Sequence, residues 1–172
     1  MNEAVKAIIE RSSCNKYKPE HLKKEEIQLI VKAGLNAASG MNRQSQRLVV
    51  VQNDAMVKKL SAMNAAVMGM DGDPFYGAPD LIIVLADKST GTYLYDGSLA
   101  MGNMLNAAYA MGLGARWIHR AKEMFASQEG KALLKEWGLE GDLEGIGCCI
   151  AGYPDMPMET KEKVPDRVVY VD

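Results

Sequence analysis

This chain of 172 residues has few of the residues that metal sites and nucleophilic catalysis require. It has three cysteines, of which Cys148 and Cys149 are adjacent and Cys14 stands alone, and it has no C-x-x-C pair for zinc or disulfide exchange. Its two histidines, His21 and His119, lie far apart with no cysteine at ligand spacing. These absences argue against a zinc site. Cysteines without a disulfide framework are typical of a reducing compartment, so we expect a cytoplasmic protein.

The sequence also lacks the features of membrane and nucleic-acid-binding proteins. No apolar run approaches the ~18–20 residues that cross a bilayer, and the N-terminus has no signal-peptide hydrophobic region. The formal net charge of -2 provides no excess of cations for phosphate backbones. We therefore expect neither a membrane nor a nucleic-acid partner. Hydrophobic residues at 48% and charged residues at 24% are typical of a soluble globular protein, and we assign 1–172 to a single domain.

The hydrophobic pattern predicts an α+β fold, with helices around a central mixed β-sheet. Continuous apolar runs predict buried strands within residues 47–53, 81–87, 115–118 and 145–154. Apolar residues at helical spacing predict helices within residues 5–9, 27–38 and 127–138, and a segment that is apolar nearly all round predicts a buried helix within 95–111. Asp54 is expected to be the N-cap of one more helix. The glycines of "GLG" at 112–114 follow a helix rather than a strand, so we interpret them as its terminator and not as a dinucleotide-binding loop.

The C-terminal segment 153–172 has too little pattern to pack alone until "RVVYV" near its end. A strand there needs a sheet edge to complete its hydrogen bonds. Because a long segment precedes "RVVYV", the sheet edge that it reaches can belong to another subunit. We therefore expect 153–172 to be an extended dimerisation arm that adds a strand to the partner subunit.

Several polar segments have both a structural and a ligand-binding interpretation. "RSSCNKY", from Arg11, places a row of hydrogen-bond donors directly after a short helix. "AASGMNRQSQR", at 37–47, offers amides that both donate and accept, as a heterocycle requires, but it also suits a polar turn. The lysines of the arm form either a solvated face or, beside Arg11, a phosphate site.

Two single residues leave similar alternatives open. Asn103 lies on an otherwise apolar helix, and an unpaired buried amide costs about 1–3 kcal/mol. Its partner is therefore either a carbonyl of a neighbouring helix or a ligand. His119, at the end of a strand, is either a general acid or a packed or surface histidine.

Taken together and in order, these segments resemble the nitroreductase family of flavin mononucleotide (FMN) oxidoreductases. "RSSCNKY" is similar to the family's R-R-S-x-R-K-F opening, and "AASGMNRQSQRLVVV" to its A-P-S-x-x-N-x-Q-P-W segment. The remaining matches are a Gly-Ala-Pro before the middle strand, a central helix ending in Gly-Leu-Gly, an I-x-G-Y-P turn and a basic pair: "YGAPDLIIVLAD", "GNMLNAAYAMGLGARWI", "IAGYP" and "KEK".

The resemblance implies a homodimer with two FMN sites at the subunit interface. It implies that arginine, serine and lysine side chains hold the phosphate and ribityl chain, that two amides meet the isoalloxazine edge, and that backbone after the third strand approaches flavin N5. The implied cofactor-binding residues are Arg11, Ser12, Ser13, Asn15, Ser39, Asn42, Gln44, Asn103, Ile118, His119, Arg120, Lys161 and Lys163.

The activity that the resemblance implies is that of an FMN-dependent oxidoreductase. NADH or NADPH would pass a hydride to flavin N5 and leave, and a nitroaromatic, quinone or activated alkene would then accept it, in a ping-pong mechanism. No catalytic side chain is required, which agrees with the lack of an obvious acid–base pair. The alternative is an FMN-binding module without turnover, a flavin carrier or redox sensor, because Asn15 stands where the family usually has Arg or Lys.

Overall fold

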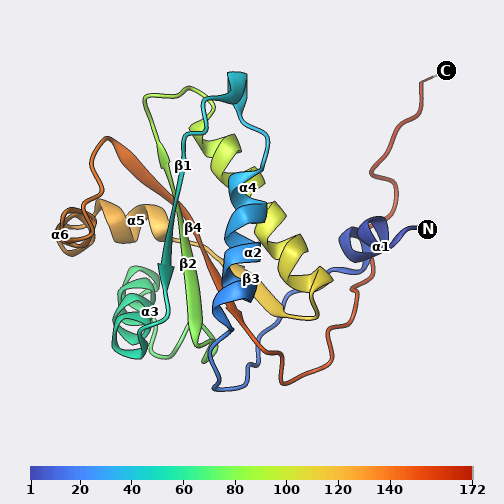
Figure 1. Ribbon diagram of the computed structural model, residues 1–172, viewed down its shortest axis with the longest axis horizontal. Helices are drawn as coiled ribbons and strands as arrows, with labels where there is room; N and C mark the ends of the chain where they lie inside the picture. Colours follow the sequence, from blue (N-terminus) through green and yellow to red (C-terminus); the bar gives the residue numbers. More distant parts are fainter. Residues whose placement is uncertain (172) are drawn as a thin grey trace.

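The computed structural model describes residues 1–171 as six α-helices, one 3₁₀ helix and four strands (Figure 1). In chain order these are α1 (Glu3–Glu10), α2 (Lys24–Leu35), η1 (Gly40–Asn42), β1 (Gln46–Val51), α3 (Asp54–Met68), β2 (Asp80–Asp87), α4 (Tyr93–Ala110), β3 (Gly114–Ile118), α5 (Ala121–Ala126), α6 (Gln128–Glu136) and β4 (Leu143–Gly152). The strands expected at 47–53, 81–87, 115–118 and 145–154 are all present, and the α+β prediction is confirmed. No helix among these residues is long and apolar enough to cross a membrane.

The four strands form one sheet in the order β1-β2-β4-β3, and every neighbouring pair is antiparallel. The expectation of a mixed sheet is therefore wrong for the strands of this chain. β2 and β3 point the same way and are joined through α4, but β4 inserts between them and runs opposite to both. No two parallel strands become neighbours, and β1 and β3 form the two edges.

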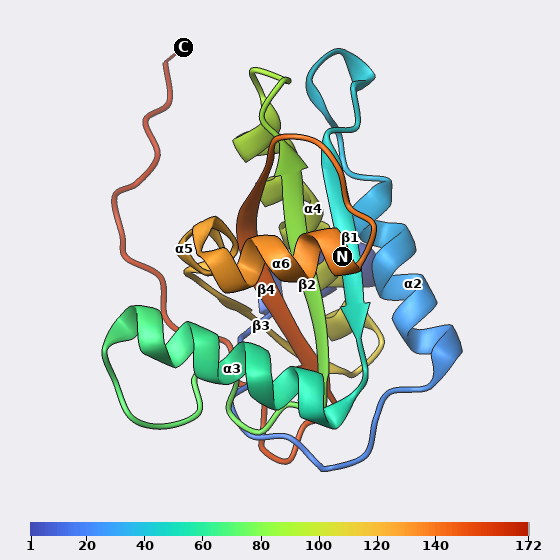
Figure 2. The same cartoon turned by 90° about the vertical axis from the view of Figure 1, so that its left-hand side faces the viewer.

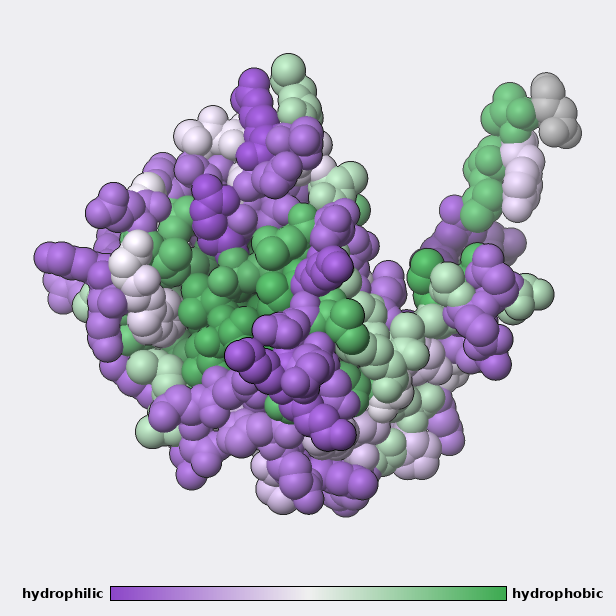
Figure 3. Space-filling model, in the orientation of Figure 1, coloured by the Kyte–Doolittle hydropathy of each residue, from purple (hydrophilic) through white to green (hydrophobic). Residues whose placement is uncertain are grey.

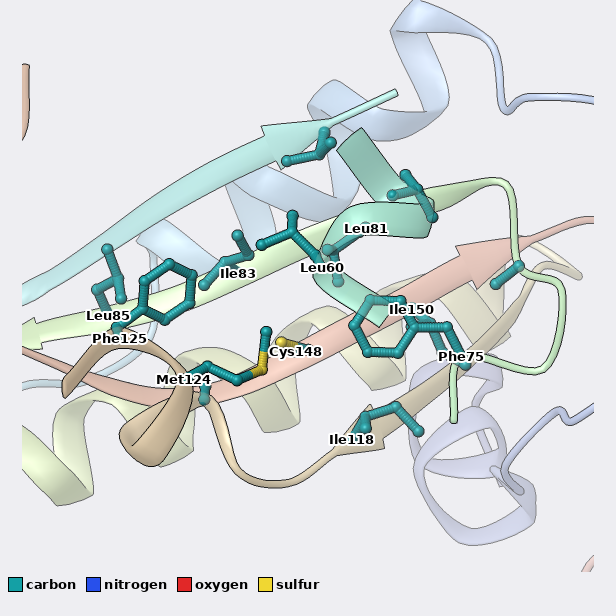
Figure 4. Close-up of a cluster of buried hydrophobic side chains, with 14 of the residues drawn as sticks. Leu60, Phe75, Leu81, Ile83, Leu85, Ile118, Met124, Phe125, Cys148 and Ile150 are labelled. Carbon is teal, nitrogen blue, oxygen red and sulfur yellow. The ribbon is translucent and has the colours of Figure 1, made fainter. Parts of the chain in front are cut away.

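The sheet is covered on both faces, which explains its continuous apolar strands. Along β2, Leu81, Ile83 and Leu85 point toward α3, α5 and α6 (Figure 4). The alternate residues of β2, with Ile82 and Val84 fully buried, pack against α2 and α4. Figure 2 shows α3 and α6 in front of the strands and α4 behind them, so the molecule has three layers.

The adjacent cysteines follow the same alternation. Cys148 lies in the cluster under α3 and α5, while Cys149 lies in the cluster under α4. Burial raises the pKa of each thiol to about 12. Both cysteines are therefore packing residues of two separate cores.

The structure corrects one helix cap expected from the sequence and confirms one helix terminator. Asn53, not Asp54, caps α3, because its side chain accepts from the Met56 N–H at 2.9 Å. Asp54 is the first helical residue, where its charge favours the positive end of the helix dipole. Gly112 ends α4 with a φ of +73°, as expected for a glycine terminator. The apolar stripe of α1 faces solvent, with Ile8 59% exposed.

The segment 153–171 extends away from the three layers and forms no strand within the described residues. An isolated bridge between Tyr17 and Pro154 holds its start. Figure 1 shows the rest passing α1 toward the C-terminus, and Val168 to Val171 are all exposed. The expected strand "RVVYV" pairs with no other strand among residues 1–171.

Candidate functional site

A cavity of about 650 Å³ lies where three distant parts of the chain meet. One wall is the segment 11–15 after α1, the second is the segment 156–163 of the arm, and Arg116 of β3 completes it. The predicted residues that the structure brings together here are Arg11, Ser12, Ser13, Asn15, Lys161 and Lys163.

Two hydrogen bonds hold the walls of this cavity, one to the sheet and one to α1. Cys14 N–H donates to the Ala115 carbonyl of β3 at 3.2 Å, so the donor-rich segment lies along the free edge of that strand. The hydroxyl of Thr160 donates to the carbonyl of Glu10 at 2.8 Å, which ties the arm to the end of α1. The lysines of the arm are thereby brought to the same cavity as Arg11.

The charges of the lining suit an anionic group. Four cationic side chains line the cavity, against two acidic ones, Glu159 and Glu162. Ser12 Oγ is buried and has no hydrogen-bond partner among residues 1–171. A phosphorylated ligand would balance the excess positive charge of the lining. It would also accept a hydrogen bond from a serine hydroxyl. The residues present therefore suit the phosphate of FMN. Lys16 does not contribute its charge to this cavity, because its Nζ pairs with Asp155 at 2.8 Å.

Arg116 is the cavity residue that sequence reasoning missed. It is half-buried, and its guanidinium carbon lies 4.7 Å from the centroid of the Tyr76 ring, a cation–π contact. No carboxylate within the described chain lies in salt-bridge distance of it. An arginine inside the apolar run "ARWI" was the available sign, because an unpaired cation in a strand requires a partner.

The turn after β3 places the next predicted residues. Ile118 is buried in the core, His119 is exposed, and Arg120 has a left-handed backbone with a φ of +75°. The His119 ring makes an edge contact with Trp117 at a centroid distance of 6.0 Å. His119 is therefore neither buried nor paired with a base, which agrees with a surface histidine rather than with an acid–base pair.

The predicted residues Ser39, Asn42 and Gln44 form a second cluster, around η1. Gln44 N–H donates to Ser39 Oγ, and Gln44 Nε2 donates to Asn42 Oδ1, each at 3.0 Å. Asn42 and Gln44 both have positive φ, at +54° and +50°, as does Met41 between Gly40 and Asn42. Such strained positions persist only where the surroundings hold them, and they concentrate at functional sites.

Asp96 of α4 holds this strained turn in place. The carboxylate is buried and accepts from Gly40 N–H at 2.9 Å and from Ser45 Oγ at 2.7 Å. Burial of Asp96 opposes its ionisation, but the hydrogen bonds from Gly40, Ser45 and Thr92 outweigh burial and lower the pKa of the carboxyl below its ordinary value. A charged anchor therefore fixes the turn at neutral pH.

The two clusters do not meet within one chain. Figure 1 shows η1 at the end of the molecule where α2 leads into β1, away from α1 and the arm that passes it. Asn103 lies in neither cluster, because its Nδ2 donates to the Ala33 carbonyl of α2 at 3.2 Å. Of the two partners expected for the Asn103 amide, a ligand or a carbonyl of a neighbouring helix, the structure shows the carbonyl.

Comparison with known proteins identifies the family to which this fold belongs. A model of the Nitroreductase family matches residues 8–153. A protein of Archaeoglobus fulgidus named "Putative NADH dehydrogenase/NAD(P)H nitroreductase" is 30% identical over 162 residues, which cover 90% of this chain and 87% of that protein. A nitroreductase of Desulfitobacterium hafniense, crystallised with bound FMN, is 28% identical with a TM-score of 0.89, and 100% of each chain is covered. A nitroreductase of Bacteroides fragilis with bound FMN shares the fold, with a TM-score of 0.91 at 23% identity and 100% coverage of each chain.

Fold and cavity together define an α+β protein with a cationic cavity at a sheet edge. The chain belongs to the nitroreductase family.

Proposed function

We propose that this protein is an FMN-dependent NAD(P)H oxidoreductase that works as a homodimer. The observation that supports the proposal most strongly is the cavity itself, where Arg11, Arg116 and two arm lysines gather from three distant segments. The FMN phosphate brings about two negative charges. It would accept charge-assisted hydrogen bonds from these cations and from the hydroxyls of Ser12 and Ser13.

The second half of the site would come from the partner subunit. In this proposal, Asn42 and Gln44 of one chain meet the isoalloxazine edge of the FMN whose phosphate the other chain holds. The separation of the two clusters within one chain supports a shared site. The strained backbone around η1 also supports it, because that strain is maintained at the surface by a buried anchor rather than relieved.

The arm is proposed to complete the dimer by pairing with the free edge of the partner's β1. Beside this edge lies an apolar pocket of about 370 Å³, lined among others by Val31, Leu35 and Val50. Figure 3 shows hydrophobic surface around β1 and α2, and separately at the tip of the arm. A strand edge with an apolar surface is a template for strand addition, and the exposed Val168, Val169 and Val171 supply the apolar side chains.

Bound FMN would supply hydride-transfer chemistry between NADH or NADPH and a nitroaromatic, quinone or activated alkene. In this proposal Arg11, Arg116, Lys161 and Lys163 would bind the phosphate, and the backbone of the turn at 118–120 would orient the ring. No side chain of the cavity is required as an acid or base, because hydride transfer needs orientation rather than a catalytic pair.

The test is an absorption spectrum followed by NADH or NADPH addition. Purified protein, or apoprotein reconstituted with FMN, is expected to be yellow and to bleach with the reductant. Arg11→Ala is expected to weaken FMN binding by about 1.5–3 kcal/mol, the range for a charged hydrogen bond. Colourless protein that does not bind added FMN would refute the proposal, and unchanged affinity of Arg11→Ala would refute the phosphate assignment.

A flavin-binding module without turnover is the second candidate, favoured by Asn15. This residue lines the cavity with an amide, at the position where the family usually has a cation. Steady-state oxidation of NADH or NADPH with a nitroaromatic acceptor distinguishes the two. Flavin that binds but never turns over would favour the carrier or sensor.

A further inference from the structure

We propose that Asn64, on α3, is a positioning residue that aims the Arg120 backbone N–H at flavin N5. The inference rests on the proposed FMN site, and it concerns a residue that no sequence motif singled out. Asn64 is 0% exposed, and it lies beneath the turn that joins β3 to α5.

The contacts of Asn64 determine its orientation. Nδ2 donates to the His119 carbonyl at 2.7 Å and to Met124 Sδ at 3.2 Å. Because both neighbours accept, the amino end of the amide must face them. Oδ1 is buried without a partner among residues 1–171. A buried amide with one end unpaired costs stability, so the fold maintains this bond to the turn at the expense of an unsatisfied oxygen.

The bond to His119 dictates the direction of the next N–H. In a trans peptide the carbonyl and the N–H point in opposite directions. Since the His119 carbonyl points inward to Asn64, the Arg120 N–H points away from the core. No described residue accepts a hydrogen bond from it. Arg120 also has a φ of +75°, which a residue other than glycine rarely adopts. The turn therefore presents a fixed, unused donor.

Such a donor acts on the two redox states of a flavin differently. N5 of the oxidised ring is a hydrogen-bond acceptor, whereas after two-electron reduction N5 carries a hydrogen of its own. An N–H aimed at N5 therefore stabilises the oxidised form and polarises N5 toward hydride. Without Asn64 the peptide is free to rotate, and the oxidised form loses that stabilisation.

The test is the two-electron midpoint potential of bound FMN in Asn64→Leu, which keeps the side-chain size and removes the donor. We expect a rise of about 30 mV, which is a tenfold change in a two-electron equilibrium constant. Ser61→Ala is the matched control, because Ser61 is a buried polar residue of the same helix that bonds to Asp73 instead of to the turn. The control is expected to lose stability and keep its potential.

Asn64→Asp supplies a second readout. A carboxylate cannot donate to the His119 carbonyl, whereas a carboxylic acid can. The difference in midpoint potential between this variant and wild type is therefore expected to shrink as the pH falls. A purely structural role of Asn64 would produce no such profile.

Amide hydrogen exchange of Arg120 in the FMN-free protein tests the geometry independently of the flavin. Exchange is expected to be changed in Asn64→Leu and unchanged in Ser61→Ala. Equal potentials in wild type and both Asn64 variants, or an unaltered Arg120 amide, would overturn the inference. Absence of FMN binding by the wild type would instead refute the proposed function, and the amide measurement would still decide whether Asn64 orients the turn.

Discussion

Arg116 shows how much one side chain can add to a cavity of this kind. The Tyr76 ring restrains its guanidinium at the wall of the cavity, at a position where a strand pattern favours an apolar residue. A restrained cation loses little side-chain entropy when it binds an anion. Arg116 is thus placed to supply positive charge on the same cavity as the neutral Asn15.

We predict that Arg116→Gln weakens FMN binding by about 1.5–3 kcal/mol, because a charged hydrogen bond is replaced by a neutral one. Quenching of flavin fluorescence on titration into apoprotein measures the affinity. Lys16→Gln is the control, since Lys16 follows the same segment but pairs with Asp155 outside the cavity. Equal losses in the two variants would show that only general charge matters and would contradict a specific role for Arg116.

At the scale of elements, the linker between the cavity segment and α2 is held by one buried carboxylate. Asp80, the first residue of β2, accepts from Leu22 N–H at 2.6 Å and from Gln52 Nε2 at 3.0 Å. It also bonds to His21 Nδ1 at 2.8 Å. The start of α2 is thereby attached to the end of the sheet.

This attachment makes stability depend on pH. The hydrogen bond with Asp80, followed by the charges of Asp80 and Asp54, raises the pKa of His21 above its ordinary 6.5. The folded protein therefore binds the His21 proton more tightly than the unfolded chain does. The stabilisation is complete below pH 6.5 and is lost as the pH rises through the higher pKa of the folded state.

We predict that the free energy of unfolding falls more steeply in wild type than in His21→Gln as the pH rises above 6.5. Urea unfolding at a series of pH values measures it, and the difference between the two proteins isolates His21 from other groups that titrate in this range. Parallel pH profiles would show that His21 contributes nothing through its charge.

At the scale of the whole molecule, the arm joins the two proposed roles of this chain. It brings lysines to the cavity of its own subunit and extends an apolar tip away from it. Cofactor binding and dimerisation are therefore expected to depend on the same segment.

We predict that truncation after Pro154 weakens both the dimer and FMN binding, because it removes the arm together with Lys161 and Lys163. Size-exclusion chromatography with detection of flavin absorbance measures both properties at once. Truncation after Arg167 is the control, since it removes the apolar tip and keeps both lysines. This shorter truncation is expected to weaken the dimer more than it weakens the phosphate contacts. A stable yellow dimer from the longer truncation would contradict both roles of the arm.

Several features of this protein were predictable from the sequence because they depend on neighbours along the chain. The apolar run at 81–87 indicated a strand buried on both faces, and the structure confirms it as β2. A segment that is apolar nearly all round located α4, and Gly112 ends it as expected. The order of six short motifs also indicated the family, because motif order is a property of the chain and needs no contacts.

Other features were decided only by the tertiary structure, because they join residues far apart in the sequence. Local pattern does not determine which strand lies between two others, so the insertion of β4 that makes the sheet antiparallel was missed. The role of Arg116 follows from its contact with Tyr76 and from the arm that lines the same cavity. The role of Asn64 follows from its hydrogen bond to the His119 carbonyl. Periodicity records which side of an element is buried, whereas long-range packing decides which group that side meets.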